Sequence, residues 1–565
     1  MGFTDDLRFS LHNNDCDRML KKCITLNNVR EGKRIHAHLI KTGLGLCIFL
    51  VNRLVEMYAK CDNLLDARNV FDRMPMRNVF SWNTMIAGYF KWGSIDHARQ
   101  LFENMPERDD VSWNTMITGY DRNGYSQEAL ECYWEMMAEG IVPSAITFSS
   151  VLSSCAKLPA PKQGKQVHAH IIGVKCQSDM IVGVGLVDMY AKGGCIEDAR
   201  LVFDRMTERN VVSWNAMITG YGENGLGEEA LMFFYEMQQL GMKPDQVTII
   251  IILTACFKSG KVQDACNVFD EIPERNVSSW NAMIAGYVQN GDSEQAMQLF
   301  LQMLQDVRPD ETTFASVVTA CASLAALQQG KQVHGLVTRS GLESSVFVGS
   351  ALVDVYSKCG STEHAQQVFD NLLERNLVCW NTMITGYAQN GQGQLAIQLF
   401  EEMLKTGIVP NHVTYVSVLS ACSHTGLLDE GLRYFNLMSE KHRILPRASH
   451  YTCMIDLLGR AGRLDEAEKL VKNAPFDSNA AMWLALLSAC RLHGNLELAE
   501  RASKCLFEME PQISGPYVLM SNIYAAAGRW VGVANIRKLM RDRGVKKEPG
   551  CSWIEIKNTI HNFLD

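Results

Sequence analysis

Apolar residues recur along this chain with the three-to-four-residue spacing of amphipathic helices. Residues 211–245 carry two such stripes, which are Trp214, Met217, Ile218 and Tyr221, followed by Ala230, Phe233, Phe234 and Met237. Ser213 is predicted to cap the first helix, and Asn224-Gly225 is predicted to end it. The spacing therefore predicts two antiparallel helices joined by a short loop.

The same two-helix pattern repeats along the chain. A Trp-Asn motif marks five copies, and its tryptophans are Trp82, Trp113, Trp214, Trp280 and Trp380. Successive tryptophans lie 31, 101, 66 and 100 residues apart, and these steps combine units of 31, 34 and 35 residues. A single unit cannot bury both stripes, so stacked units predict an all-helical superhelical solenoid. We predict that the tryptophans are core anchors.

The units divide the chain into four predicted parts. These are a short N-terminal extension at 1–12, about 14 repeats at 13–478, two weaker helical repeats at 479–547 and a tail at 548–565. In the tail, Trp553-Ile554-Glu555-Ile556 and Ile560-His561-Asn562-Phe563 flank Lys557-Asn558-Thr559. This change of period predicts a short β-hairpin.

Composition narrows the classes of partner. A net charge of −8 argues against bulk electrostatic affinity for nucleic acid, although it allows a local groove. The longest apolar run, Val247 to Phe257, is too short to cross a bilayer, so we expect no membrane partner. The first residues lack the Arg/Ser-rich pattern of an organelle presequence, so no clear transit peptide is expected. Buried helix positions are predicted for Cys23, Cys155, Cys256, Cys321 and Cys422.

Three unit types alternate, and their order resembles a known family. One type carries Gly32-Lys33-Arg34-Ile35-His36, and a 31-residue type carries Leu54-Val55-Glu56-Met57-Tyr58. With the Trp-Asn type, these lengths and signatures resemble plant pentatricopeptide repeats of the P-L-S subclass, over roughly 13–565. Residues 479–547 resemble the family's E motifs. The resemblance implies a right-handed superhelix similar to that of tetratricopeptide repeats.

A row of polar residues follows the tryptophans at the fifth position of each unit. Helical geometry places this position about 100° from the core stripe, so we expect it to face a groove. Such a row can meet one base of single-stranded RNA per unit. In the family that the chain resembles, the fifth and last residues of a unit together select the base. The corresponding pairs are Asn52/Asn78, Asn83/Asp109, Asn114/Ser144, Asn215/Asp245, Asn281/Asp310, Ser350/Asn376 and Asn381/Asn411.

The resemblance also implies which base each pair prefers. Asn/Asp implies U, Asn/Ser implies C, Asn/Asn implies a pyrimidine and Ser/Asn implies A, so units 48–411 predict the RNA Y-U-C-n-n-U-n-U-n-A-Y. Apolar residues at position two sandwich the base in this family, and they correspond to Phe80, Val111, Val212 and Val378, with Ser278 in the short unit 277–310. The alternative interpretation is that asparagine after tryptophan only shapes the helix start.

Several units depart from this pattern. Val184 and Ile250 occupy position five and cannot form a base-edge hydrogen bond. Weak readers are expected at Ser149, Ala315 and Val416.

No catalytic constellation is present in the sequence. Relatives of this subclass often end in a cytidine deaminase domain with an H-x-E and C-x-x-C zinc motif, and neither motif occurs here. The pairs His36/His38 and His168/His170 lack the further ligands of a tetrahedral metal site, so we interpret them as structural. We expect no enzymatic activity, no cofactor and no metal.

The resemblance favours a site-recognition factor for organellar C-to-U RNA editing. Such a factor binds single-stranded organellar RNA and recruits a deaminase in trans through its E region. The alternatives are a factor for RNA stability, splicing or translation, and, against the 31/35 alternation, a protein–protein scaffold. We expect a mitochondrial location, with the chloroplast as the alternative. The basic cluster Arg537, Lys538, Arg541, Arg543, Lys546 and Lys547 is interpreted as a contact for RNA phosphates, a contact for an acidic partner or a solvated helix face.

Overall fold

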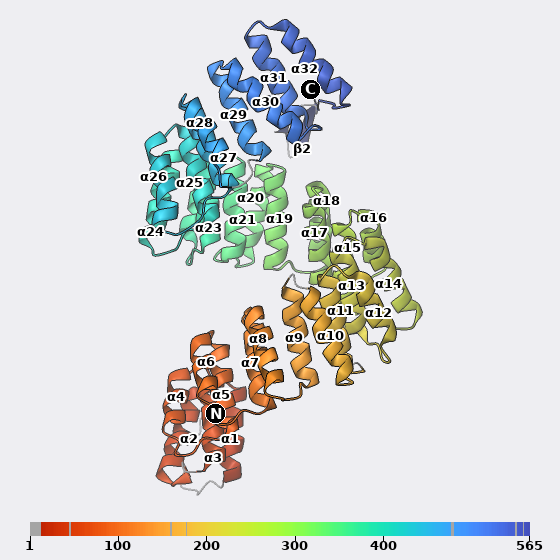
Figure 1. Ribbon diagram of the computed structural model, residues 1–565, viewed down its shortest axis with the longest axis vertical. Helices are drawn as coiled ribbons and strands as arrows, with labels where there is room; N and C mark the ends of the chain where they lie inside the picture. Colours follow the sequence, from red (N-terminus) through yellow and green to blue (C-terminus); the bar gives the residue numbers. More distant parts are fainter. Residues whose placement is uncertain are drawn as a thin grey trace. The chain divides into compact units, whose positions relative to one another are not determined.

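The computed structural model describes residues 13–44, 47–158, 161–176, 178–475, 479–547, 551–556 and 559–564. In these residues it contains 32 α-helices and two β-strands (Figure 1). The predicted N-terminal extension at 1–12 lies outside them. The chain divides into two compact units, Met1–Glu271 and Ile272–Asp565, and every contact below lies within one unit. The described helices include none long and apolar enough to span a membrane.

The helices alternate between first and second helices of the repeats, which confirms the predicted helix pairs. The first helices are α1 (Asn13–Thr25), α3 (Ile48–Lys60), α5 (Val79–Lys91), α7 (Asp110–Arg122), α9 (Ala145–Lys157), α11 (Met180–Lys192), α13 (Val211–Glu223), α15 (Gln246–Lys258), α17 (Val277–Gln289), α19 (Glu311–Ser323), α21 (Val346–Lys358), α23 (Leu377–Gln389), α25 (His412–Thr425), α27 (Ala448–Arg460), α29 (Ala480–His493) and α31 (Ser514–Ala526). The second helices are α2 (Val29–Lys41), α4 (Leu64–Asp72), α6 (Ile95–Glu103), α8 (Ser126–Ala138), α10 (Pro161–Gly173), α12 (Ile196–Arg205), α14 (Gly227–Gln239), α16 (Val262–Asp270), α18 (Ser293–Asp306), α20 (Leu327–Arg339), α22 (Thr362–Asn371), α24 (Gly393–Lys405), α26 (Leu428–Glu440), α28 (Leu464–Lys472), α30 (Leu496–Met509) and α32 (Trp530–Asp542).

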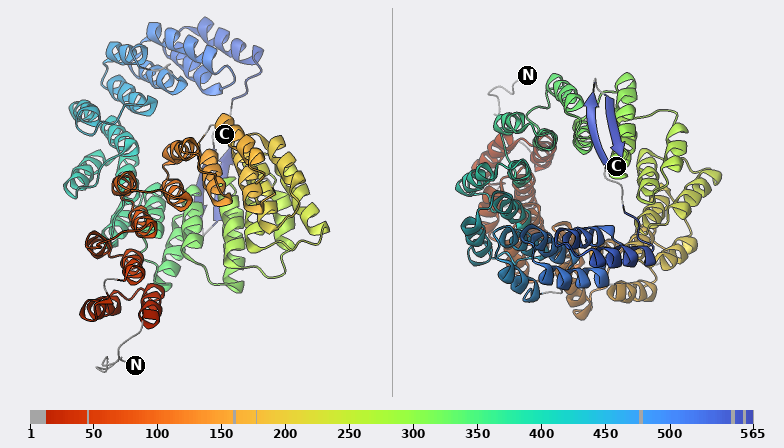
Figure 2. Two further views of the ribbon diagram at one scale, coloured as in Figure 1. Left: turned by 60° about the horizontal axis from the view of Figure 1, so that its bottom comes forward. Right: turned by 90° about the horizontal axis from the view of Figure 1, so that it is seen from above.

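The two rows of helices pack in a regular way inside each compact unit. Within a unit, each first helix contacts the first helix of the repeat that follows it there. Each second helix contacts its own first helix and the first helix that follows it in the same unit. The right panel of Figure 2 shows how one helix pair follows another along the chain. Stacking thus gives each apolar stripe the partner that an isolated pair lacks.

The tryptophans of the Trp-Asn motif are buried, which confirms their predicted role as core anchors. Trp214 is 1% exposed. Its ring centroid lies 4.9 Å from that of Phe203 on α12 and 4.7 Å from that of Phe233 on α14. Because α12 belongs to the preceding repeat, the indole joins two repeats as well as two helices. The five cysteines predicted to be buried are also buried.

The starts of the first helices differ from the prediction in one respect. The residue that caps α13 is Asn210, whose side-chain oxygen accepts a hydrogen bond of 3.0 Å from the Ser213 amide. Ser213 is the third helical residue and completes a capping box. Both residue types cap helices well, so the sequence alone favoured the wrong one. The predicted end at Asn224-Gly225 is confirmed, with Gly225 at a φ of 75°.

In the 31-residue units, an arginine that follows the short second helix bonds back to carbonyls near the end of that helix. In the unit 180–210, Arg209 donates from Nε to the carbonyl of Phe203 (3.1 Å) and from Nη2 to that of Asp204 (2.8 Å). Its guanidinium lies 4.7 Å from the centre of the Phe203 ring. Equivalent bonds to the corresponding carbonyls are made by Arg77, Arg108 and Arg375. The side chain therefore satisfies carbonyls that a helix end leaves free.

The tail contains two antiparallel strands, β1 (Cys551–Ile556) and β2 (Thr559–Leu564), drawn as blue arrows in Figure 2. In their register Cys551 lies opposite Leu564, and Ile556 lies opposite Thr559. The strands fall where the sequence predicts a hairpin. Of the predicted connection Lys557-Asn558-Thr559, Thr559 is instead the first residue of β2, and the other two residues lie outside the described residues.

Candidate nucleic-acid interface

In the repeats with a predicted pair, the last residue is the N-cap of the next first helix. Asp245, for example, precedes α15, and its side chain accepts a 2.8 Å hydrogen bond from the amide of Thr248. The other predicted partner residues that cap a helix in this way are Asn78, Asp109, Ser144, Asp310, Asn376 and Asn411. The cap side chain consequently lies beside position five of its own repeat, at the start of the helix that it caps.

The predicted pairs are in direct contact in five units. The position-five Nδ2 donates to the cap oxygen over 3.1 Å in Asn52/Asn78, 3.4 Å in Asn114/Ser144, 3.5 Å in Asn215/Asp245, 3.0 Å in Asn281/Asp310 and 3.4 Å in Asn381/Asn411. We call each contact between a position-five residue and the next cap a cap joint. Because an amide nitrogen carries two hydrogens, one N–H of each asparagine remains for another acceptor.

The two remaining pairs differ from these five. A side-chain hydrogen bond from Asn83 is among the causes that lower the pKa of Asp109. Ser350 instead donates to the carbonyls of Val346 (2.9 Å) and Phe347 (3.0 Å) on its own helix rather than to Asn376. A serine hydroxyl on a helix often bonds back to the preceding turn.

The position-five asparagines are more buried than the sequence predicted. Asn52, Asn83, Asn215 and Asn381 are 5–8% exposed, whereas a groove-facing row was expected. The expectation considered one helix, but the cap and the first turn of the next helix cover this position. These asparagines therefore have a structural role as well, because they bond to the cap at the start of the next first helix, as the alternative interpretation proposed in part.

The aspartate caps carry a negative charge at neutral pH. Burial raises the pKa of Asp245, but hydrogen bonds from Thr248 and from Asn215 outweigh it, and the pKa lies below its ordinary value. The same balance lowers the pKa of Asp109 and of Asp310. An ionised carboxylate only accepts hydrogen bonds, so it fixes the neighbouring amide with its nitrogen toward the cap.

An exposed apolar residue lies near the pair in most repeats. The second helical residues Phe80, Val111, Val212 and Val378 are 51–58% exposed, as a row that contacts a ligand requires. Val111 lines a groove of about 770 Å³ together with Asn114, Ser144 and Ile146. Val212 and Asn215 line a second groove of about 490 Å³.

Basic residues occur in the last turn of many first helices. Lys91 and Arg122 line the groove of about 770 Å³, at the opposite end of the helices from the caps. Equivalent last-turn cations are Lys60, Lys157, Lys192, Lys258 and Lys358. Five of these cations pair with carboxylates over 2.7–2.9 Å, so much of their positive charge is neutralised within the protein. They are Lys60, Lys91, Lys157, Lys192 and Lys358.

Comparisons with known proteins identify the repeats. A PPR repeat model matches residues 49–79, 80–109, 185–211, 247–277, 350–377, 413–442 and 449–473, and a PPR repeat family model matches 108–157, 209–258, 275–323 and 375–424. A chloroplastic pentatricopeptide repeat-containing protein of Arabidopsis thaliana is 40% identical over 582 residues, which cover 97% of this chain and 68% of that protein. The chain belongs to the pentatricopeptide repeat family.

Other relatives have similar coverage. A second Arabidopsis thaliana pentatricopeptide repeat-containing protein is 41% identical over all of this chain and 90% of its own length. A mitochondrial one is 35% identical over 97% of this chain, which spans only 63% of that protein. The crystal structure of the pentatricopeptide repeat protein PPR10 in complex with an 18-nt psaJ RNA element has a TM-score of 0.58. At 16% identity, over 96% of this chain and 81% of that chain, this likeness shows a shared fold.

An E motif model matches residues 493–555, which include α30, α31, α32 and β1. No cytidine deaminase domain was found in these 565 residues. In α32, Trp530 and Val531 are 69% and 77% exposed. Arg537, Lys538 and Arg541 of the same pentatricopeptide helix are exposed as well.

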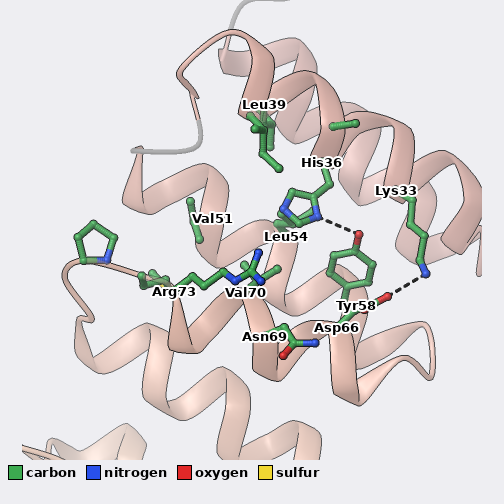
Figure 3. A pocket seen from close by; sticks show the side chains of 14 residues that line it. Lys33, His36, Leu39, Val51, Leu54, Tyr58, Asp66, Asn69, Val70 and Arg73 are labelled. Atoms are coloured by element: carbon green, nitrogen blue, oxygen red, sulfur yellow. Dashed lines mark hydrogen bonds and ion pairs between the residues drawn. The ribbon is translucent and has the colours of Figure 1, made fainter.

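The Gly-Lys-x-x-His signature joins one pentatricopeptide repeat to the next through its second helix. His36 Nδ1 lies 3.1 Å from the Tyr58 hydroxyl, and Lys33 pairs with Asp66 over 2.9 Å, at a hollow of about 660 Å³ (Figure 3). A Cβ on Gly32 would lie 2.4 Å from Met57 Cε, so any larger residue would require the Met57 side chain to move. We call this contact a histidine joint.

The histidine joint recurs twice more. His168 and Tyr190 are 2.8 Å apart, as are His334 and Tyr356, and Lys165 pairs with Asp198 over 3.1 Å. The sequence singled out these histidines but gave no partner for them. Among the described residues no group of His, Cys, Asp or Glu could hold a metal ion. The tyrosine of the following repeat, 22 residues along the chain, is the signal that would have identified the contact.

Proposed function

We propose that this chain is a sequence-specific, single-stranded RNA-binding protein that acts in organellar RNA modification as a site-recognition factor for C-to-U editing. The observation that carries the proposal is the cap joint, repeated along the first helices. Each asparagine there has one N–H committed to the cap and one N–H left for a base edge. The identity of the cap residue, which varies from repeat to repeat, decides which donor or acceptor the amide offers to a base.

The neighbouring groups fit the same ligand. The exposed apolar residues at position two offer apolar contacts to the faces of bases, and Phe80 also offers an aromatic ring of the kind on which RNA readers stack bases. The last-turn cations offer contacts to phosphates, which position the strand without reading its sequence. The protein PPR10, whose fold is similar, was crystallised with an RNA element.

The binding of defined RNAs tests this function. We expect tight binding to Y-U-C-n-n-U-n-U-n-A-Y and weaker binding to a control with purines at the pyrimidine positions. Each mispaired base is expected to cost about 1–3 kcal/mol, the range of a lost base-edge contact. Equal affinity for both RNAs, measured by fluorescence anisotropy at one salt concentration, contradicts the proposal.

A change of code sharpens this test. Replacing Asn281 by Ser together with Asp310 by Asn should move the preference at the eighth nucleotide from U to A. The preference at the third nucleotide, which belongs to the unit of Asn114, serves as the internal control. A variant that loses affinity for every RNA without changing its preference shows that the pair is structural only.

The deaminase is expected to bind in trans at the outer face of α32. An exposed tryptophan beside exposed arginines has the composition of a binding hot spot, and the positive charge complements an acidic surface on the partner. This face belongs to a second helix, whereas the cap joints lie on first helices. The chain can therefore bind the deaminase and the RNA at the same time. Replacing Trp530 by Ala should abolish co-purification of an editing deaminase and leave RNA affinity unchanged.

An organellar location is supported by the names of the relatives, which include mitochondrial and chloroplastic proteins. We favour the mitochondrion, with the chloroplast as the alternative. Sequencing of organellar transcripts with and without the gene tests both location and function. Loss of editing at a cytidine downstream of the predicted RNA is expected, whereas unchanged editing with altered transcript abundance points to RNA stability instead.

A further inference from the structure

A hydroxyl group recurs beside the cap joints, on the third residue of the following first helix. Its oxygen lies within hydrogen-bond reach of the position-five Oδ1 in four joints. The distances are 2.6 Å for Ser81 and Asn52, 2.5 Å for Thr147 and Asn114, 2.6 Å for Thr313 and Asn281, and 2.7 Å for Thr414 and Asn381. The reading amide thus has a partner at both ends, with the cap at its nitrogen and the hydroxyl at its oxygen.

The capping box fixes the direction of this bond. Thr147 Oγ1 accepts from the backbone N–H of Ser144 over 2.9 Å. Ser81 accepts in the same way from Asn78 over 3.2 Å. The hydroxyl hydrogen has two acceptors within reach in each joint, and the position-five Oδ1, at 2.5–2.7 Å, is nearer than the cap oxygen, at 2.8–3.1 Å. The hydroxyl therefore acts as the donor that selects the oxygen end of the amide.

Repeats without a reading amide orient the hydroxyl differently. Val184 and Ile250 occupy position five in the repeats before α13 and α17. There Ser213 donates to the carbonyl of its own cap, Asn210, over 2.8 Å, and Ser279 donates to that of Asn276 over 2.9 Å. The acceptor of the hydroxyl therefore differs with the residue at position five, although the hydroxyl belongs to the next repeat.

Two joints show a third arrangement. Ser112 and Thr248 donate to the cap carboxylates, over 2.7 Å to Asp109 and 2.8 Å to Asp245. The amide oxygens of Asn83 and Asn215 are then buried without a hydrogen-bond partner among the described residues. An aspartate cap can fix the amide by itself, because it only accepts. An asparagine cap is held with its oxygen toward the amide by the backbone N–H that it caps. A serine cap can both donate and accept, so at Ser144 the hydroxyl of Thr147 is the group that distinguishes the two ends of the amide.

We propose that this hydroxyl, on the third residue of a first helix, is a positioning group for base reading by the preceding repeat. An asparagine amide has nearly the same shape after a half-turn about its last bond, but its donor and acceptor exchange places. By holding Oδ1, the hydroxyl of Ser81, Thr147 or Thr414 keeps the free N–H directed to the base. This inference rests on the proposed RNA-binding function.

The test uses the full chain and RNAs that vary at single nucleotides. Replacing Thr147 by Val keeps the shape of the side chain and removes the hydroxyl. The preference for C over a purine at the third nucleotide should fall by roughly three- to tenfold, the effect of one neutral hydrogen bond. Thr147→Ser, which retains the hydroxyl, should restore the preference.

The chain offers a matched control. Ser213→Ala removes an equivalent capping-box hydroxyl beside Val184, so it should lower thermal stability by a similar amount and leave the preference at every nucleotide unchanged. If Thr147→Val keeps the wild-type preference while Asn114→Ala loses it, the hydroxyl has no positioning role and the inference is wrong. If the wild type shows no preference at the third nucleotide and Asn114→Ala changes nothing, the proposed function itself fails.

In a double variant the two effects should not add. Asn114→Ala with Thr147→Val is expected to show the preference of Asn114→Ala alone, because the hydroxyl acts only through the amide. A further loss in the double variant would mean that Thr147 contacts the RNA by itself, which also overturns the positioning role.

Discussion

The cap joints and the histidine joints connect different pairs of neighbouring repeats, and they do so with different chemistry. In the cap joint of Asn114, Ser144 and Thr147, polar side chains meet but leave an N–H unused. In the histidine joint, His168 bonds with Tyr190 and Lys165 pairs with Asp198. The groups of the histidine joint satisfy one another, and Gly164 admits Met189 where a Cβ would lie 2.3 Å from its sulfur. This chain thus joins some neighbouring repeats through side chains that satisfy one another, and others through amides that keep spare hydrogen-bonding capacity.

The largest expected effect comes from the scaffold that both joints share. Trp214→Ala should lower the free energy of local unfolding of α12–α14 by about 3–5 kcal/mol, because the indole is fully buried. Hydrogen exchange of the amides in these helices measures it. Base preference at the first three nucleotides should persist, since each repeat contacts only its neighbours.

The control for this change is Met232→Ala, because Met232 of α14 is exposed and should contribute less than 0.5 kcal/mol. Loss of preference at the first three nucleotides in the Trp214 variant would mean that scaffold and reading are not separable.

A smaller effect separates the two kinds of joint by pH. Burial lowers the pKa of His36, His168 and His334 below the ordinary value of 6.5. Their stabilising contribution is therefore present above pH 6.5 and is lost as the pH falls through the lower folded-state pKa. The thermal midpoint of the wild type should fall between pH 7.5 and pH 5.5.

A variant with glutamine at all three positions should depend less on pH over this range. At pH 7.5 it should be less stable by about 0.5–1.5 kcal/mol per joint, the contribution of a hydrogen bond. Its base preferences should equal those of the wild type. An identical pH profile in wild type and variant shows that other groups cause the acid sensitivity.

The smallest effect concerns the apolar row beside the cap joints. Val111→Ala removes two methyl groups that are half exposed, so folding should be unaffected. RNA affinity should fall by roughly two- to fivefold, because the lost apolar area is buried only on binding. Leu201→Ala on α12, which removes an exposed leucine from a second helix, is the control and should bind as the wild type does. Equal losses in both variants would remove the distinction between the rows.

Much of the fold could be predicted from the sequence because each repeat carries the same local signals. The spacing of Trp214, Met217 and Ile218 defines a stripe, and a stripe with no partner inside its own unit requires a neighbour. Helix starts were less certain. Asn210 and Ser213 are both good caps, and only the structure shows that one caps the helix and the other completes the box.

The surroundings of the position-five residues could not be predicted from one helix alone. The periodicity placed Asn215 away from the core stripe, but the cap of α15 covers it and leaves it 8% exposed. Its contact with Asp245 joins residues 30 positions apart. The pairing of Asn with its cap came from family resemblance, and the structure adds the physical contact between them.

The cap shared by two repeats determines where an engineered array can be cut. A cassette taken as residues 79–109 contains Asn83 and Asp109 but leaves out Ser112, whose amide and hydroxyl both donate to the Asp109 carboxylate. In a new array that cap would receive whatever third residue its new neighbour supplies. A portable reading segment for designed RNA binders should therefore run from the asparagine through the first turn of the next helix.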